Sequence, residues 1–257
     1  MPDVVLYEVA DRIATVTLNR PEARNAMNAD VRRELPAALR RAEDDAEVDV
    51  VILTGADPAF CAGLDLKELG SSERRRPAQG DPVVNRPFPP MTKPVIGAIN
   101  GVAVTGGFEL ALSCSFLVAS ERARFADTHA RVGVMPGWGL TVLLPQAVGV
   151  RKARELSLTG NYLTAEEALA FGLVNHVVGH AELLPTCRRL AADIVGNDQE
   201  GVRQMLATYD EVTGTTVAEG WEVEARIARA WQERTFDPAE VERRRQAIVE
   251  RGRSQVT

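Results

Sequence analysis

Cysteine is scarce in this sequence, and so are the patterns that would give its cysteines a structural or catalytic task. Three occur among the 257 residues: Cys61, Cys114 and Cys187. Their number is odd and their spacing is not that of metal ligands, which excludes a disulfide scaffold and a cysteine-rich metal site. Reduced, mostly buried thiols in a cytoplasmic protein are therefore expected.

Excess positive charge and long apolar runs are also missing. Thirty basic against thirty-six acidic residues give a net charge of −6, which disfavours a general nucleic-acid binder. Residues 1–12 lack a basic stretch followed by an apolar one, so no secretory signal is predicted. The uncharged stretch 132–150 contains several prolines and glycines and predicts a loop and a short helix, not a membrane span. GxSxG and HExxH motifs are absent, which leaves serine-hydrolase and zinc-protease functions unsupported.

The remaining composition, 45% hydrophobic and 26% charged, is that of an ordinary globular protein. Short, β-branched apolar runs at 48–53, 94–99 and 116–119 are typical of strands buried on both faces. Asn28 offers an N-cap to an amphipathic helix, in which Pro36 predicts a kink or a late start. Strands that alternate with helical segments predict an α/β fold.

The C-terminal part of the sequence changes character. Thr164 and Glu167 form a predicted capping box for one more short helix of the core. From about residue 181 the pattern is helical and strongly charged, with little that predicts a strand. We therefore expect a mixed core at 1–195 and a helical region at 196–257.

The segment 71–91 is rich in proline and arginine. Such a composition predicts a loop or a poorly ordered segment. It is either a lid over a ligand or a solvated insertion, and the sequence favours neither.

Two glycine-bearing segments, 54–69 and 98–114, each lead from a strand through a turn into the start of a helix. The first backbone N–H groups of a helix lack internal partners and lie at its positive end, where they bind negatively charged oxygen. If the two starts faced each other, the amides of Leu64 and Gly106 would form an oxyanion hole. The second segment is not a dinucleotide-binding fingerprint, because its glycine spacing differs.

Five segments resemble the crotonase (enoyl-CoA hydratase/isomerase) superfamily in order and spacing: 18–28, 60–69, 93–120, 123–139 and 163–178. The resemblance implies a crotonase fold, an α/β spiral core of repeated ββα units, followed by a helical C-terminal region that mediates assembly into a homotrimer or a dimer of trimers. It also implies an acyl-CoA substrate and no metal or redox cofactor, since CoA is part of the substrate.

Family members hold the thioester carbonyl with two backbone amides, which match those of Leu64 and Gly106. Their CoA moiety runs along two segments, and the matching positions here are Glu22, Ala23, Arg24, Ala62, Leu64, Asp65, Leu66 and Lys67. Of these, Arg24 and Lys67 are candidates to bind the CoA phosphates, with ordinary solvated charges as the alternative.

In the hydratases of this family two glutamates flank the substrate double bond. The first matches Glu109, and the second position holds His129, which departs from the pattern. A histidine exchanges protons near neutral pH, so a Glu109/His129 pair could still add water across the 2,3-double bond of an enoyl-CoA, which is the function we expect. Isomerisation, decarboxylation, thioester hydrolysis and non-catalytic acyl-CoA binding stay open. Asp127 could replace His129, but a strand would direct it to the opposite face.

Overall fold

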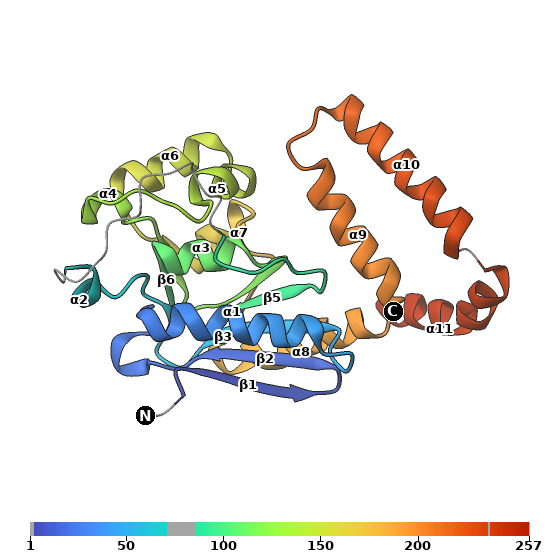
Figure 1. Cartoon of the computed structure of the whole chain (residues 1–257), viewed down its shortest axis with the longest axis horizontal. Coiled ribbons are helices and arrows are strands. Elements are labelled where there is room, and N and C mark those ends of the chain that lie inside the picture. Colours follow the sequence, from blue (N-terminus) through green and yellow to red (C-terminus); the bar gives the residue numbers. More distant parts are fainter. Residues whose placement is uncertain (1–2, 71–85, 236, 257) are drawn as a thin grey trace. The chain divides into compact units, whose positions relative to one another are not determined.

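The computed structural model describes residues 3–70, 86–235 and 237–256, so most of the loop predicted at 71–91 lies outside the described residues. The chain divides into two compact units, Met1–Arg203 and Gln204–Thr257. The strands, all in the first unit, are β1 (Val5–Ala10), β2 (Ile13–Leu18), β3 (Val50–Gly55), β4 (Ala59–Cys61), β5 (Val95–Ile99), β6 (Val102–Val104), β7 (Phe116–Ser120), β8 (Arg124–Ala126), β9 (Leu163–Thr164) and β10 (His176–Val178) (Figure 1).

Helices occur in both units (Figure 1). They are α1 (Ala29–Asp44), α2 (Leu66–Leu69), α3 (Gly106–Leu112), α4 (His129–Val132), α5 (Leu140–Val148), α6 (Val150–Thr159), α7 (Ala165–Ala170), α8 (Leu183–Val195), α9 (Gln199–Val212), α10 (Val217–Thr235) and α11 (Pro238–Val256), with short 3-10 turns at Pro21–Ala23 and His180–Glu182.

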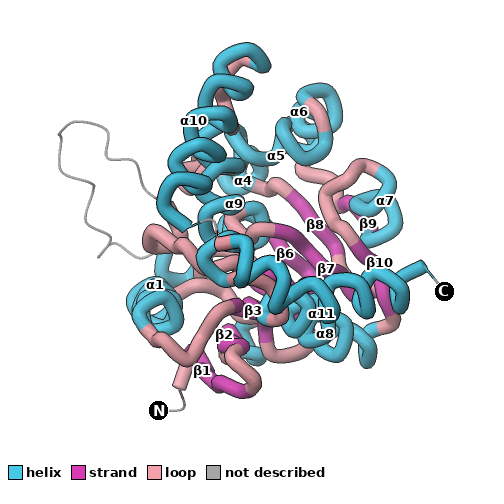
Figure 2. The backbone as a smooth tube through the Cα atoms, turned by 90° about the vertical axis from the view of Figure 1, so that its right-hand side faces the viewer, coloured by secondary structure: helices cyan, strands magenta, loops and turns pink. Residues whose placement is uncertain are grey.

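The strands of the first unit form two sheets, with the orders β1-β2-β3-β5-β7-β10 and β4-β6-β8-β9. Pairing is parallel except for β1 with β2 and β8 with β9. From β3 to β8 the chain alternates between the sheets, and each pair of strands leads into a helix: α2, α3 or α4. Figure 2 shows β6 and β8 of the smaller sheet side by side. The predicted α/β fold of repeated ββα units is thus confirmed.

The larger sheet is buried on both faces. In β3, Val51 and Leu53 belong to the main hydrophobic core, whereas Val50 and Ile52 face the cluster that includes residues of α8. This explains why the central strands read as unbroken apolar runs instead of alternating ones. The strand predictions at 48–53, 94–99 and 116–119 are confirmed within two residues.

Predicted side-chain caps begin two helices of the first unit. Asn28 Oδ1 accepts a hydrogen bond from Val31 N at 3.0 Å, so α1 starts at Ala29 and runs through Pro36. The late start considered for this helix is therefore wrong. Thr164 and Glu167 form the predicted capping box, in which each side chain accepts from the other residue's backbone N–H, at 3.2 and 2.8 Å.

The stretch 132–150 folds as predicted, into a loop followed by the nine-residue helix α5. Among the described residues, we find no helix with the length and apolar character needed to cross a membrane.

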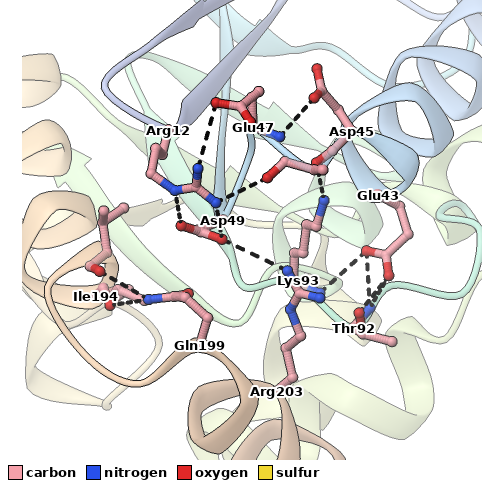
Figure 3. A network of polar contacts seen from close by, with 12 residues as sticks. Arg12, Glu43, Asp45, Glu47, Asp49, Thr92, Lys93, Ile194, Gln199 and Arg203 are labelled. Carbon is pink, nitrogen blue, oxygen red and sulfur yellow. Dashed lines mark hydrogen bonds and ion pairs between the residues drawn. The ribbon is translucent and has the colours of Figure 1, made fainter.

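A buried polar network joins the beginning of β3 to the end of the first unit (Figure 3). Asp49, which is 2% exposed, pairs with Arg12 on one side and lies 3.7 Å from Arg203 Nη2 on the other. Arg203 stands in the first turns of α9. This ion pair holds the start of α9 on the first unit, which therefore extends beyond residue 195.

In the same network Lys93 caps the C-terminal end of α1 (Figure 3). Its Nζ donates hydrogen bonds of 2.7 Å to the carbonyl oxygens of Ala42 and Asp45. The last carbonyls of a helix have no partner within the helix, and a cation satisfies them well. Since Lys93 lies two residues before β5, this contact fixes α1 relative to the larger sheet.

Lys93→Met is expected to lower the free energy of unfolding by about 1–3 kcal/mol, because the buried carbonyl of Ala42 and the part-buried carbonyl of Asp45 lose their donor. Urea denaturation monitored by circular dichroism measures the change. Arg40→Met, which removes an exposed cation from the same helix, is the control and should change stability little. Equal stability of the Lys93 variant and the wild type would contradict this assignment.

Candidate active site

The amides of Leu64 and Gly106 lie side by side where the two glycine-bearing segments meet. A Cβ placed on Gly106 would be 3.8 Å from Leu64 N, and one placed on Gly63 would be 3.5 Å from Gly106 N. Among the described residues, neither amide donates a backbone or side-chain hydrogen bond. Two adjacent, unsatisfied N–H groups are the donors that an oxyanion requires.

Backbone contacts on both sides hold Leu64 in place. Met27 N donates to Gly63 O at 2.7 Å and Asp65 N donates to Met27 O at 3.1 Å. Gly63 has a φ of +91°, in the left-handed region that glycine adopts without strain. Gly106 is the first residue of α3, whereas Leu64 lies two residues before α2 begins, so the start of a helix supplies one of the two amides.

Close backbone packing places the start of α3. A Cβ on Gly107 would lie 2.1 Å from Cys61 O, so this position admits no side chain. Thr105, just before α3, has φ +54° and ψ −114°, a strained conformation for a β-branched residue. Its Oγ1 is hydrogen-bonded to Thr128 Oγ1, which links the start of α3 to the residue before His129.

Glu109 lies in the first turn of α3 and is 2% exposed. Its Oε1 accepts a 2.8 Å hydrogen bond from the backbone amide of Trp138. Its Oε2 is 3.6 Å from Nε2 of His129, an ion-pair distance that is too long for a direct hydrogen bond. The structure thus brings together the two side chains that the sequence proposed as a catalytic pair.

His129 begins α4 and is 6% exposed. Its Nδ1 is 2.6 Å from Oδ1 of Asp127, which also accepts the His129 backbone amide at 3.1 Å. Burial lowers the pKa of His129, but the bond to Asp127 and the carboxylates of Asp127 and Glu109 outweigh it and raise the pKa to about 9. The imidazole is therefore protonated at neutral pH.

The expectation that Asp127 faces away from His129 is wrong. Side chains two residues apart in a strand lie on the same face, so strand alternation would not have separated Asp127 from His129, and β8 in any case ends at Ala126. Asp127 instead lies in the turn before α4 and bends back onto the histidine. Hydrogen bonds from His129 and Ser157 lower the pKa of Asp127 although burial acts in the opposite direction.

The positions predicted to contact CoA come together from two segments. Ala62 N donates to Arg24 O at 3.0 Å, and residues 27 and 64 form a bridge, so the segment around Glu22, Ala23 and Arg24 runs beside the one that leads into α2. The side chains of Glu22, Arg24, Leu66 and Lys67 are exposed there. Asp65 differs, because its carboxylate accepts from Lys67 N and pairs with Arg20 at 3.1 Å.

Cys61 lies at the end of β4, near both amides, but its thiol is fully buried. Its burial was expected, and burial raises its pKa to about 12, so the thiol does not form the thiolate that a nucleophile requires.

Three features of the site were not assigned from the sequence: the roles of Asp127, Thr105 and Arg20. The roles of Thr105 and Arg20 depend on contacts with residues far away in the chain, Thr128 and Asp65, which no local spacing predicts. A signal existed for Asp127 alone: a carboxylate two residues before a histidine can bond to it in a turn. Even in a strand, two residues at this spacing share a face, so the spacing gave no reason to expect Asp127 to face away from the histidine.

Comparison with known proteins identifies the class to which this fold and site belong. Residues 8–257 match the family model described as "Enoyl-CoA hydratase/isomerase". A solved structure of an enoyl-CoA hydratase from Mycobacterium tuberculosis H37Rv is 55% identical, with a TM-score of 0.77 over 88% of this chain and 98% of that one.

Two curated relatives agree with this. The "Short-chain-enoyl-CoA hydratase" of Clostridium acetobutylicum is 40% identical over 77% of this chain and 78% of its own. The "Crotonyl-CoA hydratase" of Syntrophomonas wolfei is 36% identical over 86% of each chain. This chain belongs to the enoyl-CoA hydratase/isomerase family.

Proposed function

We propose that this enzyme adds water across the 2,3-double bond of an enoyl-CoA thioester. The observation that carries the proposal is the arrangement of two free amides, those of Leu64 and Gly106, beside the buried Glu109/His129 pair. Relatives named as enoyl-CoA hydratases support the same reaction.

In this proposal the thioester oxygen accepts hydrogen bonds from the two amides. Glu109 takes a proton from water, and the resulting hydroxide forms a bond to the β-carbon. The electron pair of the double bond moves toward the thioester, and the amides stabilise the enolate oxygen. Protonated His129 then donates its proton to the α-carbon. The amides supply the electrophilic assistance, so no step requires a metal ion or a redox cofactor.

The assay is the loss of the ultraviolet absorbance of a conjugated enoyl thioester when purified protein is added to crotonyl-CoA. Hydration predicts that the 3-hydroxyacyl-CoA forms in equal amount, which mass spectrometry detects. A protein that binds crotonyl-CoA without product, or that converts another acyl-CoA only, would contradict the proposal and favour one of the family's other reactions.

Arg24 and Lys67 are proposed to bind the CoA phosphates. Arg24→Ala and Lys67→Ala should each raise KM for crotonyl-CoA about 2- to 5-fold and leave kcat unchanged, since exposed charges contribute modestly and act equally on substrate and transition state. The matched control is the crotonyl thioester of N-acetylcysteamine, which lacks phosphates. If KM for this truncated substrate rose equally, the two cations would have another role.

A homotrimer, or a dimer of such trimers, is the proposed assembly. Large apolar side chains are exposed on α10 and α11, including Val217 at 82%, Trp221 at 70% and Ile248 at 62%. Exposed apolar clusters on helices commonly mark protein interfaces. Light scattering after gel filtration tests this, and a monomer at micromolar concentration would refute it.

The proposed location is the cytoplasm. All three cysteines are unpaired, as is usual in a reducing compartment. A relative from Arabidopsis thaliana is named as peroxisomal, so family membership alone leaves the compartment open. Microscopy of a tagged protein in the source cells decides between them.

A further inference from the structure

One buried group near the candidate site has no role in the reaction outlined above. Asp127 is 2% exposed and accepts two hydrogen bonds from His129, one from its backbone amide and one from its ring Nδ1, besides one from the hydroxyl of Ser157. A buried carboxylate is costly unless it is paired, and this one is paired with a single ring.

The geometry fixes which nitrogen of His129 faces the site. Because Nδ1 is hydrogen-bonded to Asp127, Nε2 is the nitrogen that faces Oε2 of Glu109, at 3.6 Å. A carboxylate behind the ring holds the imidazole in one orientation and favours its protonated form.

The charges around the ring are few. Asp127 and Glu109 are the charged groups that act on His129, and both favour the imidazolium. Ser157, on the neighbouring helix α6, donates to Asp127 without adding charge. Arg131, on the same helix as His129, is directed elsewhere, toward Thr159 O and Asn161 Oδ1.

We propose that Asp127 is a positioning residue for the hydration: it keeps His129 protonated, with Nε2 directed at the α-carbon and at Glu109. This rests on the proposed function. When His129 has given its proton to the α-carbon, Glu109 holds the proton taken from water. Transfer of that proton from Glu109 to Nε2 restores both groups, so that one water molecule is consumed and no proton is left over. Asp127 keeps its negative charge throughout and makes Nε2 basic enough to accept.

The test compares Asp127→Asn with the wild type. Asparagine keeps an oxygen acceptor for the ring but loses the charge. We expect the pH at which kcat falls on the basic side to move down by about one to two units. We also expect kcat to fall at least 10-fold at pH 8, with KM for crotonyl-CoA changed less than 2-fold, since positioning acts on proton transfer and not on CoA binding.

Asp57→Asn is the matched control. Oδ2 of Asp57 is hydrogen-bonded to Nε2 of another histidine, His180, at 3.0 Å. This pair takes no part in the proposed reaction. This variant also removes a carboxylate from a histidine, and it should leave the basic limb of the pH profile in place. If both variants shifted the limb equally, the effect would not come from His129.

An NMR titration of the imidazole Cε1–H signals keeps the proposal testable without turnover. The chain has three histidines, so His129→Gln assigns the signal. In the wild-type protein the His129 signal should titrate near pH 9 and not near 6.5, and in Asp127→Asn its midpoint should fall. A wild-type midpoint at or below 6.5, or one that is unchanged in the variant, would overturn the positioning role even if hydration is observed. Absence of hydration with a normal NMR shift would instead overturn the proposed function.

Discussion

Glu109→Gln is expected to lower kcat/KM for crotonyl-CoA about 10³-fold, the largest catalytic effect of any single change proposed here. Glutamine has the same shape and can still accept the hydrogen bond from Trp138 N, but it cannot take a proton from water. Hydroxide would then have to form without a base. Binding of crotonyl-CoA should be largely kept, because the two amides and the CoA contacts are untouched.

Initial rates followed by the loss of enoyl absorbance measure this effect, with calorimetry for substrate binding. Glu121→Gln, which changes an exposed carboxylate, serves as the control and should keep wild-type rates. Unchanged kcat/KM in the Glu109 variant would remove this residue from the mechanism. Loss of binding with unchanged kcat would make it a substrate-binding group instead.

Gly107→Ala is expected to have the largest effect on stability, a loss of about 2–3 kcal/mol. The new methyl group would lie 2.1 Å from the carbonyl oxygen of Cys61 and 2.8 Å from its carbonyl carbon. Both are backbone atoms of β4, so no side-chain rotation relieves the clash and α3 must move away from the sheet. The Gly106 amide would move with it, and hydration should weaken together with stability.

Thermal unfolding measures the first consequence, and we expect Tm to fall by about 5–10 °C for a unit of this size. Gly137→Ala is the control for stability, because a Cβ at that position meets nothing within 4 Å. A Gly107 variant as stable as the Gly137 variant would show that the contact between β4 and α3 is less rigid than the structure indicates.

Glu109 and Gly107 differ in how far the sequence alone predicts their importance. Glu109 could be found from the chain alone, because an acidic residue in the first turn of a helix with an apolar surrounding is unusual and the segment resembles the family. The requirement for glycine at position 107 could not be found from the chain alone. It follows from the approach of a strand separated from it by more than forty residues.

The elements of the fold were predictable where local chemistry decides them. The unbroken apolar run of β3, the Asn28 cap and the Thr164/Glu167 capping box are short-range signals, and each appears where it was expected. The late helix start predicted from Pro36 was wrong because the low helix propensity of proline was outweighed. The Asn28 cap and the buried face of α1 stabilise a helix that starts before Pro36 and continues through it.

The amino-acid sequence by itself determined the class of fold and the family, since these depend on order and spacing along the chain, and its resemblance to the family predicted the two amides and the Glu109/His129 pair as the site. Only the tertiary structure decided the pKa of His129. A histidine's protonation depends on the charges that folding brings within a few ångströms, and here these are Asp127 from the preceding turn and Glu109 from another helix. The 3.6 Å distance between His129 and Glu109 depends on how two helices pack, which no pattern along the chain encodes, and together with the 2.6 Å contact to Asp127 it raises the pKa of the ring.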